Sequence, residues 1–452
     1  MKDTDEGKMG TEREGRLLCR MAVPFAFSML VQALYNIVDS AFVGQVSEDA
    51  LSAVSVVFPF QSLFAALNVG ISVGMSQLIS MNMGKGDQNR AKKAAGQGLF
   101  LALCCTAFFI VFGIFFSDDF FRISGITGPI KDMGMDYLRI ITIFSLGVFT
   151  GFVTERMLMS TGHTGCTVAC QITGAVLNII LDPILIFGCG PIPAMGVRGA
   201  AIATVFAQHA SMVLAVVLHL RKNKVLRFSP KDIKPQGKIL KSICGIGASA
   251  TVKQGAAAVI SMFVNGILVR ISPVSTAVYG AFNKLYVLFL TPSWAIQDVL
   301  VILSAYNLGI GNRHRIMRLF RLSLVSGLIL TLLGCAVTIF FPCPLLKIFG
   351  AKEDMLSVGK TALPILACFL PFQTAASVIS ALLQGVGEGG SALLAGIAER
   401  FIFPLIFLYL SSLFKSLNLV WWSFTASEAL GLVVSALFML HIYKKKIAKL
   451  PL

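Results

Sequence analysis

The sequence predicts an all-α integral membrane protein with twelve transmembrane helices in two parallel six-helix repeats. Three observations lead to this fold class. The chain of 452 residues is 56% hydrophobic and only 13% charged, with a mean hydropathy of +0.80, which is too apolar for a soluble fold. It contains twelve apolar runs, and about 20 apolar residues suffice for a helix to cross a bilayer. The two halves of the chain also repeat the same features in the same order.

The twelve apolar runs give the expected spans. Most of them lack the strict alternation of a membrane β-barrel strand, which favours helices. The first run follows a polar segment and has no small-residue cleavage site, so we expect it to insert as a span and not to be removed as a signal peptide. The runs lie near residues 17–43, 51–80, 91–116, 136–159, 165–187, 196–220, 239–268, 274–303, 317–341, 356–384, 391–412 and 420–442.

Basic residues predict the orientation of these spans. The net charge of +16 comes from 38 Lys and Arg residues, and 25 of these lie in segments that a twelve-span chain places on one side. Loops on the cytoplasmic side are rich in Lys and Arg, so both termini are expected in the cytoplasm and no nucleic-acid partner is needed to explain the charge. The segments are residues 1–20, 85–93, 221–241, 313–321 and 444–449.

A single constant offset aligns the two halves without a gap. The loop Asn82–Arg90 aligns with Asn307–Arg315, and both carry an N-x-G-x-G-[DN] pattern. We expect a glycine in each loop to supply positive φ, and Asp87 or Asn312 to cap the helix that follows. Farther along, the same offset aligns Arg122–Gly125 with Lys347–Gly350.

This repeat predicts two lobes around a central cleft. Because six is an even number of spans, both lobes should enter the membrane with the same orientation, as in parallel-repeat transporters. Rocking of one lobe against the other would then expose the cleft to each side in turn. We assign residues 1–220 to an amino-terminal lobe, 221–241 to a cytoplasmic linker and 242–452 to a carboxy-terminal lobe.

Polar residues interrupt two apolar runs of the first lobe. In the fifth run, Asn178 and Asp182 are four residues apart and share a helix face with Gln171. In the first run, a stripe with spacings of three and four ends at Asp39. A carboxylate in a lipid-spanning helix costs about 2.5 to 3.5 kcal/mol, so it normally faces a protein interior or a water-filled cavity. We therefore predict that both acids face the cleft.

The positions of these residues along their helices predict a cation-coupling site at Asp39, Asn178, Asp182 and Thr204. Asp39, Asp182 and Thr204 lie in the outer half of their spans, so their oxygens can meet, together with the amide oxygen of Asn178. Such oxygens suit a sodium ion, whereas two neighbouring carboxylates can instead hold a proton. The alternative is structural, with Asp39 as a helix cap and Asp182 at a proline kink. Polar residues on inward stripes are expected to line a substrate cavity, namely Gln32, Tyr35, Asn36, Asn68, Gln171, Gln208 and Gln373.

Other charges in apolar runs have less specific interpretations. The adjacent charges Glu155-Arg156 and Glu399-Arg400 are expected to form local ion pairs or to extend towards the membrane surface. Three residues of the second lobe could pair across helices or line the cleft: Lys253, Lys284 and Asp298. Glu428 is the one acid of the last span, and the ten cysteines are expected to act as small hydrophobic residues.

Together these motifs resemble those of bacterial multidrug and toxin extrusion (MATE) transporters, and the resemblance covers nearly the whole chain. It is carried by Gln32-x2-Tyr35-Asn36-x2-Asp39, the G-x-G-[DN] turns, Asn178-x3-Asp182-Pro183 and Gly199-Ala-Ala-Ile-Ala-Thr204. The resemblance implies a secondary active antiporter of the bacterial inner membrane that exports organic cations or amphipathic drugs, without a cofactor, in exchange for protons or sodium ions. In prokaryotic members the cation site lies on residues that match Asp39, Asn178, Asp182 and Thr204.

The sequence also departs from part of that family. Sodium-coupled members of the NorM type carry acids in the seventh and tenth spans, where this chain has Lys253-Gln254 and Gln373-Thr374. A carboxy-lobe cation site of that kind is therefore not expected.

Two other functions remain open from the sequence alone. A flippase for a lipid-linked saccharide would need a cationic cleft, whereas the first lobe is acidic. An intramembrane transferase would need a catalytic His-Asp or paired-acid set at one membrane face, whereas the acids are spread along inward stripes. The chain has no Walker A or H-E-x-x-H motif. We therefore expect a monomeric carrier, not an enzyme, for small amphipathic or cationic substrates in the lipid bilayer.

Overall fold

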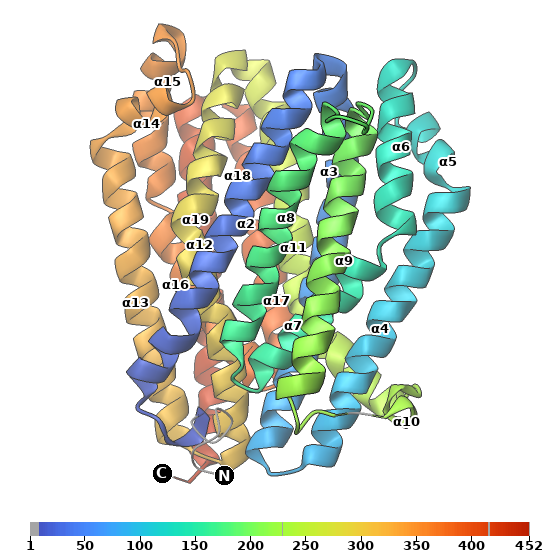
Figure 1. Ribbon diagram of the computed structural model, residues 1–452. Coiled ribbons are helices and arrows are strands. Elements are labelled where there is room, and N and C mark those ends of the chain that lie inside the picture. The colour runs from blue at the N-terminus through green and yellow to red at the C-terminus, as the bar shows by residue number, and fades with distance from the viewer. Residues whose placement is uncertain (1–8, 228, 415, 452) are drawn as a thin grey trace. The chain divides into compact units, whose positions relative to one another are not determined.

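The computed structural model describes residues 9–227, 229–414 and 416–451, and its regular elements are helices (Figure 1). In chain order they are α2 (Glu14–Val46), α3 (Glu48–Gly84), α4 (Gln88–Phe115), α5 (Ser117–Ile123), α6 (Pro129–Ile143), α7 (Leu146–Ser160), α8 (Thr164–Ile186), α9 (Val197–Lys222), α10 (Pro230–Ile233), α11 (Gly237–Ile271), α12 (Pro273–Ile310), α13 (Arg313–Phe340), α14 (Pro342–Ile348), α15 (Glu353–Ala367), α16 (Leu370–Gly385), α17 (Gly389–Ile397), the π-helix η1 (Ala398–Ile402), α18 (Phe403–Leu413), α19 (Leu417–Lys445) and the short 3₁₀ turn η2 (Ile447–Lys449).

The number of membrane spans agrees with the sequence prediction. Within the described ranges, eleven helical segments are long and apolar enough to cross a membrane, and the bent pair α6–α7 makes twelve when it is counted as one span. The two helices of this pair meet at 46°. The all-α membrane fold with twelve spans is therefore confirmed, while the orientation of the two repeats in the bilayer stays a prediction.

The described chain forms two compact units. The first contains residues 27–243, and the second contains residues 9–26 and 244–451. The divisions fall inside helices, after Ala26 in α2 and after Ile243 in α11. The predicted linker 221–241 holds the end of α9, all of α10 and the start of α11, and it belongs to the first unit.

The internal repeat reappears as matched elements in the two units. Helices α4 and α13 each have 28 residues, α5 and α14 each have 7, and both pairs start at positions that the sequence offset aligns. The predicted caps are confirmed, because Asp87 accepts a hydrogen bond from the amide of Arg90 and Asn312 accepts one from the amide of Arg315. The turns before them use Gly86 at φ 76° and Gly311 at φ 86°, where a side chain would be strained.

Each unit also has one broken span at the equivalent place. The break between α6 and α7 follows Ile143, and the break between α15 and α16 follows Ala367. In the second unit, Pro371 lacks the amide hydrogen that would bond to the carbonyl of Ala367. In the first unit, the Thr142 hydroxyl donates to the carbonyl of Leu138, a contact that often bends helices. Different residues thus interrupt the helix in the two units, and among the described helices only the α6–α7 pair is bent by more than 40°.

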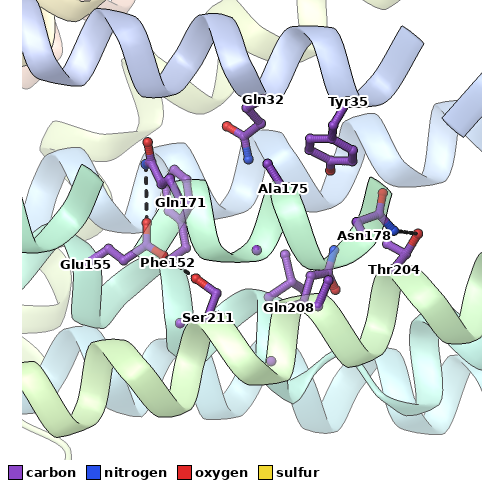
Figure 2. Close-up of a pocket in the computed structure, with 15 residues that line it drawn as sticks. Gln32, Tyr35, Phe152, Glu155, Gln171, Ala175, Asn178, Thr204, Gln208 and Ser211 are labelled. Carbon is purple, nitrogen blue, oxygen red and sulfur yellow. Dashed lines mark hydrogen bonds between the residues drawn. The ribbon is translucent and has the colours of Figure 1, made fainter. Parts of the chain in front are cut away.

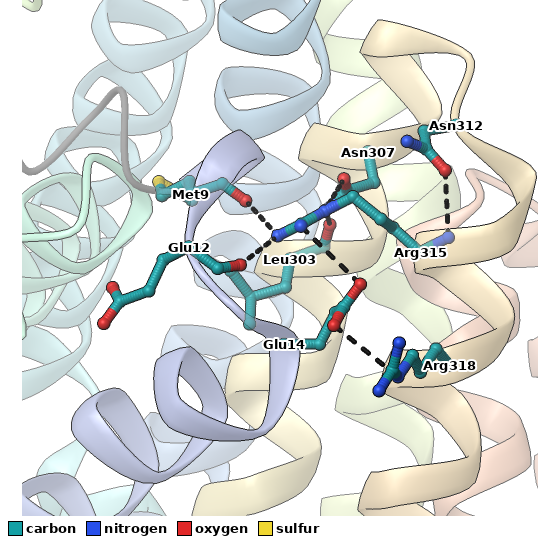
Figure 3. A network of polar contacts seen from close by, with 8 residues as sticks. All are labelled: Met9, Glu12, Glu14, Leu303, Asn307, Asn312, Arg315 and Arg318. Atoms are coloured by element: carbon teal, nitrogen blue, oxygen red, sulfur yellow. Dashed lines mark hydrogen bonds and ion pairs between the residues drawn. The ribbon is translucent and has the colours of Figure 1, made fainter. Parts of the chain in front are cut away.

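The segment before α2, which belongs to the second unit, is bonded to Arg315 of α13 (Figure 3). Its guanidinium donates to the carbonyls of Glu12 at 2.8 Å and Met9 at 3.4 Å, and to the amide oxygen of Asn307 at 3.1 Å. The same guanidinium lies 3.6 Å from the Glu14 carboxylate, which also faces Arg318. Because Arg315 and Glu14 are largely buried, these charge-assisted contacts exceed a surface ion pair in strength.

Candidate functional site

A cavity of about 100 Å³ lies within the first unit, between helices α2, α7, α8 and α9 (Figure 2). Helix α2 contributes Gln32 and Tyr35, and α7 contributes Glu155. The lining includes six residues that the sequence placed in the site or the substrate cavity: Gln32, Tyr35, Gln171, Asn178, Thr204 and Gln208.

Asn178 joins the two helices that form one wall of the cavity. Its amide nitrogen donates to Asp182 Oδ1 at 3.2 Å, one helical turn further along α8, and to Thr204 Oγ1 at 3.4 Å on α9. The short connection between the helices holds them together, because the amides of Met195 and Gly196 bond to the last carbonyls of α8. This connection satisfies backbone groups that a helix end leaves free.

Asp39 of α2 is the remaining residue of the predicted cation-coupling site, with Asn178, Asp182 and Thr204. Its carboxyl group faces that of Asp182. Among the described residues, one oxygen of each acid is buried without a hydrogen-bond partner, and so is the amide oxygen of Asn178. The orphaned atoms are Asp39 Oδ1, Asn178 Oδ1 and Asp182 Oδ2.

These orphaned oxygens fit a bound cation or proton. Buried polar atoms are normally paired, because an unpaired one costs roughly 1 to 3 kcal/mol. A sodium ion takes hard oxygen ligands of the kind that Asp39, Asn178 and Asp182 present. A proton shared by the two carboxyl groups would equally relieve their repulsion. Within the described chain, no cluster of three or more His, Cys, Asp or Glu side chains forms a transition-metal site.

Glu155 is a member of the cavity that the sequence interpretation missed. Its carboxylate accepts hydrogen bonds from Ser211 at 3.0 Å and Gln171 at 3.2 Å, and only 6% of the residue is exposed. Arg156 lies over the Phe152 ring, at 5.2 Å from its centroid, and its charge also attracts the Glu155 carboxylate. The hydrogen-bond partners of Glu155 come from α8 and α9, and the expected local ion pair with Arg156 stays a prediction. The polar stripe of Thr204, Gln208 and Ser211 on α9 was the available signal.

Three predicted cavity residues lie elsewhere. The Asn36 amide donates to the carbonyl of Gln32 on an exposed part of α2. Asn68 is buried in α3, outside the lining of this cavity. Gln373 belongs to the second unit, where its amide contacts the Tyr286 hydroxyl at 2.8 Å. The other charged pair, Glu399-Arg400, forms the local ion pair that the sequence predicted, at 3.0 Å.

The cavity is small for a drug. Pockets for drug-sized ligands measure about 300 to 1,000 Å³, whereas this one measures about 100 Å³. A substrate of that size would need α2 or α7 to move relative to the α8–α9 pair, because these helices form its walls.

Comparisons with known proteins agree with this architecture. The MatE family model matches residues 24–184 and again residues 250–410. An FAD transporter of Shewanella oneidensis is 26% identical over 354 residues, covering 78% of each chain. The multidrug export protein MepA of Staphylococcus haemolyticus is 24% identical over 408 residues, covering 90% of this chain and 89% of that protein.

A solved structure supports the fold. A MOP superfamily transporter from Pyrococcus furiosus, described as having a binding pocket of reversed polarity, superposes with a TM-score of 0.91 at 23% identity, covering 99% of this chain and 100% of that one. The two matches to the family model fall one in each half of the chain and so correspond to the internal repeat. Because that model covers well over half of the sequence, the chain belongs to the MatE family of multi-pass membrane transporters.

Proposed function

We propose that this transporter exports organic cations or amphipathic drugs in exchange for protons or sodium ions by alternating access. The observation that carries the proposal is the set of three orphaned oxygens on Asp39, Asn178 and Asp182, beside a cavity that also contains the Glu155 carboxylate. The similarity to MepA, a multidrug export protein, supports the same direction of transport. The proposed setting is the bacterial inner membrane, with a monomeric chain and both termini in the cytoplasm.

Competition between the organic cation and the proton or sodium ion for Asp39 and Asp182 would couple export of the first to import of the second. An organic cation in the cavity is attracted by ionised Asp39 and Asp182. When protons or a sodium ion neutralise these acids, that attraction falls, so the ion and the drug bind antagonistically. Coupling free energies of this kind are typically about 1 to 3 kcal/mol, which corresponds to roughly a 5- to 150-fold change in affinity.

The test is drug efflux from proteoliposomes in which a proton gradient or a sodium gradient is imposed separately. Asp39→Asn and Asp182→Asn should each abolish uphill transport while the protein still inserts, because an amide removes the charge and nearly preserves the shape. Asp119→Asn, at an exposed position, is the matched control. Uphill transport at the parent rate in both site variants would exclude this coupling site.

Two further variants separate proton coupling from sodium coupling. Asn178→Ala and Thr204→Ala each remove an oxygen that a sodium ion would use as a ligand. If sodium drives export, both should raise the sodium concentration needed for half-maximal transport. If protons drive it, the same variants should weaken transport only modestly, since the two carboxyl groups remain.

FAD is a second candidate substrate, because an FAD transporter is among the relatives. FAD carries a diphosphate, whereas Glu155 lines the cavity with a carboxylate. Asp39 and Asp182 do not line the cavity, but Asp182 bonds to the lining residue Asn178 and faces Asp39. We therefore rank organic cations first. FAD loaded into the same proteoliposomes gives the comparison, and gradient-driven FAD export without export of a cationic dye would reverse the ranking.

A further inference from the structure

A second group of buried charges lies in the second unit, around Arg400. Its guanidinium faces two acids, with Nε 3.0 Å from Glu399 Oε1 and Nη1 3.1 Å from Glu428 Oε1. Nη2 donates to the Ser377 hydroxyl at 3.0 Å. Helix α16 therefore joins η1 and α19 at this guanidinium, and we call Glu399, Arg400 and Glu428 the Arg400 cluster.

A π-helical turn brings Glu399 and Arg400 into this position. In η1 the amide of Phe403 donates to the carbonyl of Ala398, five residues earlier. The next residue, Pro404, has no amide hydrogen for the carbonyl of Arg400, so the normal helical pattern cannot continue. Such wide turns are rare and often occur at functional sites.

The two acids of the Arg400 cluster have few hydrogen-bond donors for their carboxylate oxygens. Glu399 is 0% exposed, and neither of its oxygens has a hydrogen-bond partner among the described residues, although Arg400 Nε lies close to one of them. Glu428 is 6% exposed, and its Oε2 also lacks a partner in the described chain. Three of the four carboxylate oxygens are therefore buried without a hydrogen bond.

Helix α19 and Lys253 lie on two sides of Glu399. A methyl group on Gly431 of α19 would lie 2.7 Å from Glu399 Cγ, so α19 contacts this side chain directly. On the other side, the stem of Lys253 packs against Gly396. The Lys253 ammonium attracts both glutamates from beyond ion-pair distance, and within the described residues it forms no ion pair with either. Gln373 and Tyr286 are the remaining polar neighbours, and the Gln373 carbonyl can accept from Arg400.

We propose that the Arg400 cluster is a proton-binding site in which Glu399 and Glu428 together carry one proton. Among the described residues, Arg400 is the one cation within ion-pair distance of the two carboxylates, and its single charge can balance only one of them. A buried carboxylate without a contact partner is costly. One proton on either acid leaves a neutral cluster and supplies a donor to an orphaned oxygen. The side chains of Arg400 and Glu428 are not fully enclosed by the protein, with 17% and 8% of their surface exposed.

This site is distinct from Asp39 and Asp182 and does not depend on the proposed export function. Its two acids lie in η1 and α19, whereas the first site lies in the first unit. Proton binding can also be measured without any substrate.

The experiment uses infrared difference spectroscopy of the purified full-length protein in lipid, titrated with acid. Asp39→Asn, Asp182→Asn and Glu155→Gln are combined first, so that the buried acids of the first unit give no signal. At neutral pH this protein should keep one protonated-carboxyl band, which shifts in deuterated water. If the band is missing at neutral pH, the proposal is wrong, whatever the outcome of the transport assays.

Variants then identify the side chains that give the protonated-carboxyl band. Glu399→Gln and Glu428→Gln should each remove it, because the remaining acid pairs with Arg400 and stays ionised. Gly431→Ala keeps every charge but should shift the band by displacing Glu399, and so tests the assignment if an acid variant misfolds. Glu353→Gln, at an exposed residue, is the control and should change nothing. A band that survives both glutamine variants belongs to another group and overturns the proposal.

Discussion

Gly199 lies in the first turn of α9, where a side chain would collide with the end of α8. A methyl group there would lie 2.4 Å from the carbonyl oxygen of Leu185. That carbonyl cannot turn away easily, because it accepts a hydrogen bond from the amide of Met195 at 3.0 Å. We therefore predict that Gly199→Ala forces the two helices apart.

The loss of stability expected for Gly199→Ala follows from the 2.4 Å contact with the carbonyl oxygen of Leu185. Non-bonded heavy atoms prefer a separation of about 3.5 Å, so the helices must separate locally by about 1 Å. Overpacking of this kind costs about 1 to 3 kcal/mol. At about 2 to 4 °C per kcal/mol for a unit of this size, the midpoint of thermal unfolding should fall by about 2 to 12 °C.

The same displacement should reach the candidate site. Thr204 is five residues beyond Gly199, and its hydroxyl oxygen lies 3.4 Å from the Asn178 amide nitrogen, close to the limit of a hydrogen bond. A further separation of about 1 Å would break that contact. Gradient-driven efflux should therefore fall along with stability.

Thermal unfolding in detergent and efflux from proteoliposomes check this prediction together. Gly165→Ala is the control, because it lies in α8 with no atom near the added methyl group. Alanine there should be neutral or stabilise the helix by up to about 1 kcal/mol. A Gly199→Ala protein with the parent midpoint and parent efflux would refute the close packing of α8 and α9.

Three other predictions follow from the described contacts. Arg315→Ala should speed amide hydrogen exchange in residues 9–14 by removing charge-assisted bonds of about 1.5 to 3 kcal/mol, whereas Arg318→Ala, with one ion pair, should change it less. Gln97→Ala should make residues 229–236 more sensitive to limited proteolysis, because the buried Gln97 amide bonds to the backbone of Asp232, Lys234 and Gln236. A cysteine at Lys224 should react with an impermeant maleimide only from the cytoplasmic side, and a cysteine at Asp49 or Asp119 only from outside. Asn223, next to Lys224, is buried and therefore unsuitable for labelling.

The sequence was sufficient to predict features that depend on nearby residues. The turns before α4 and α13 could be identified because positive φ requires glycine and because a capping side chain acts on an amide three residues away. The number of spans followed from the lengths of the apolar runs. The contact between Asn178 and Asp182 follows from their spacing on one helix, although their role in coupling stays a prediction.

Features that depend on other helices could not be predicted in the same way. Glu155 has a basic neighbour in the sequence, which suggested a local ion pair, but its partners Gln171 and Ser211 come from two other helices. The π-helical turn of η1 and the contact between Arg400 and Glu428 likewise depend on how α16 and α19 pack. Such contacts become visible only when the helices are placed side by side.

The repeat itself explains why the charged sites of the two units differ. At the offset that pairs the two capped turns, Glu399 and Glu428 correspond to Gly174 and Ala203, whereas Asp39 and Glu155 correspond to Val264 and Ser380. No acid of either group has an acidic counterpart in the other half, although the caps, turns and broken spans recur at matching positions. Turns and caps must be kept because the backbone of both halves needs them. A buried acid is costly in either half, so it normally has a specific partner or a functional role. The separate positions of the two charged groups therefore favour two independent ionisable sites over one inherited site in two copies.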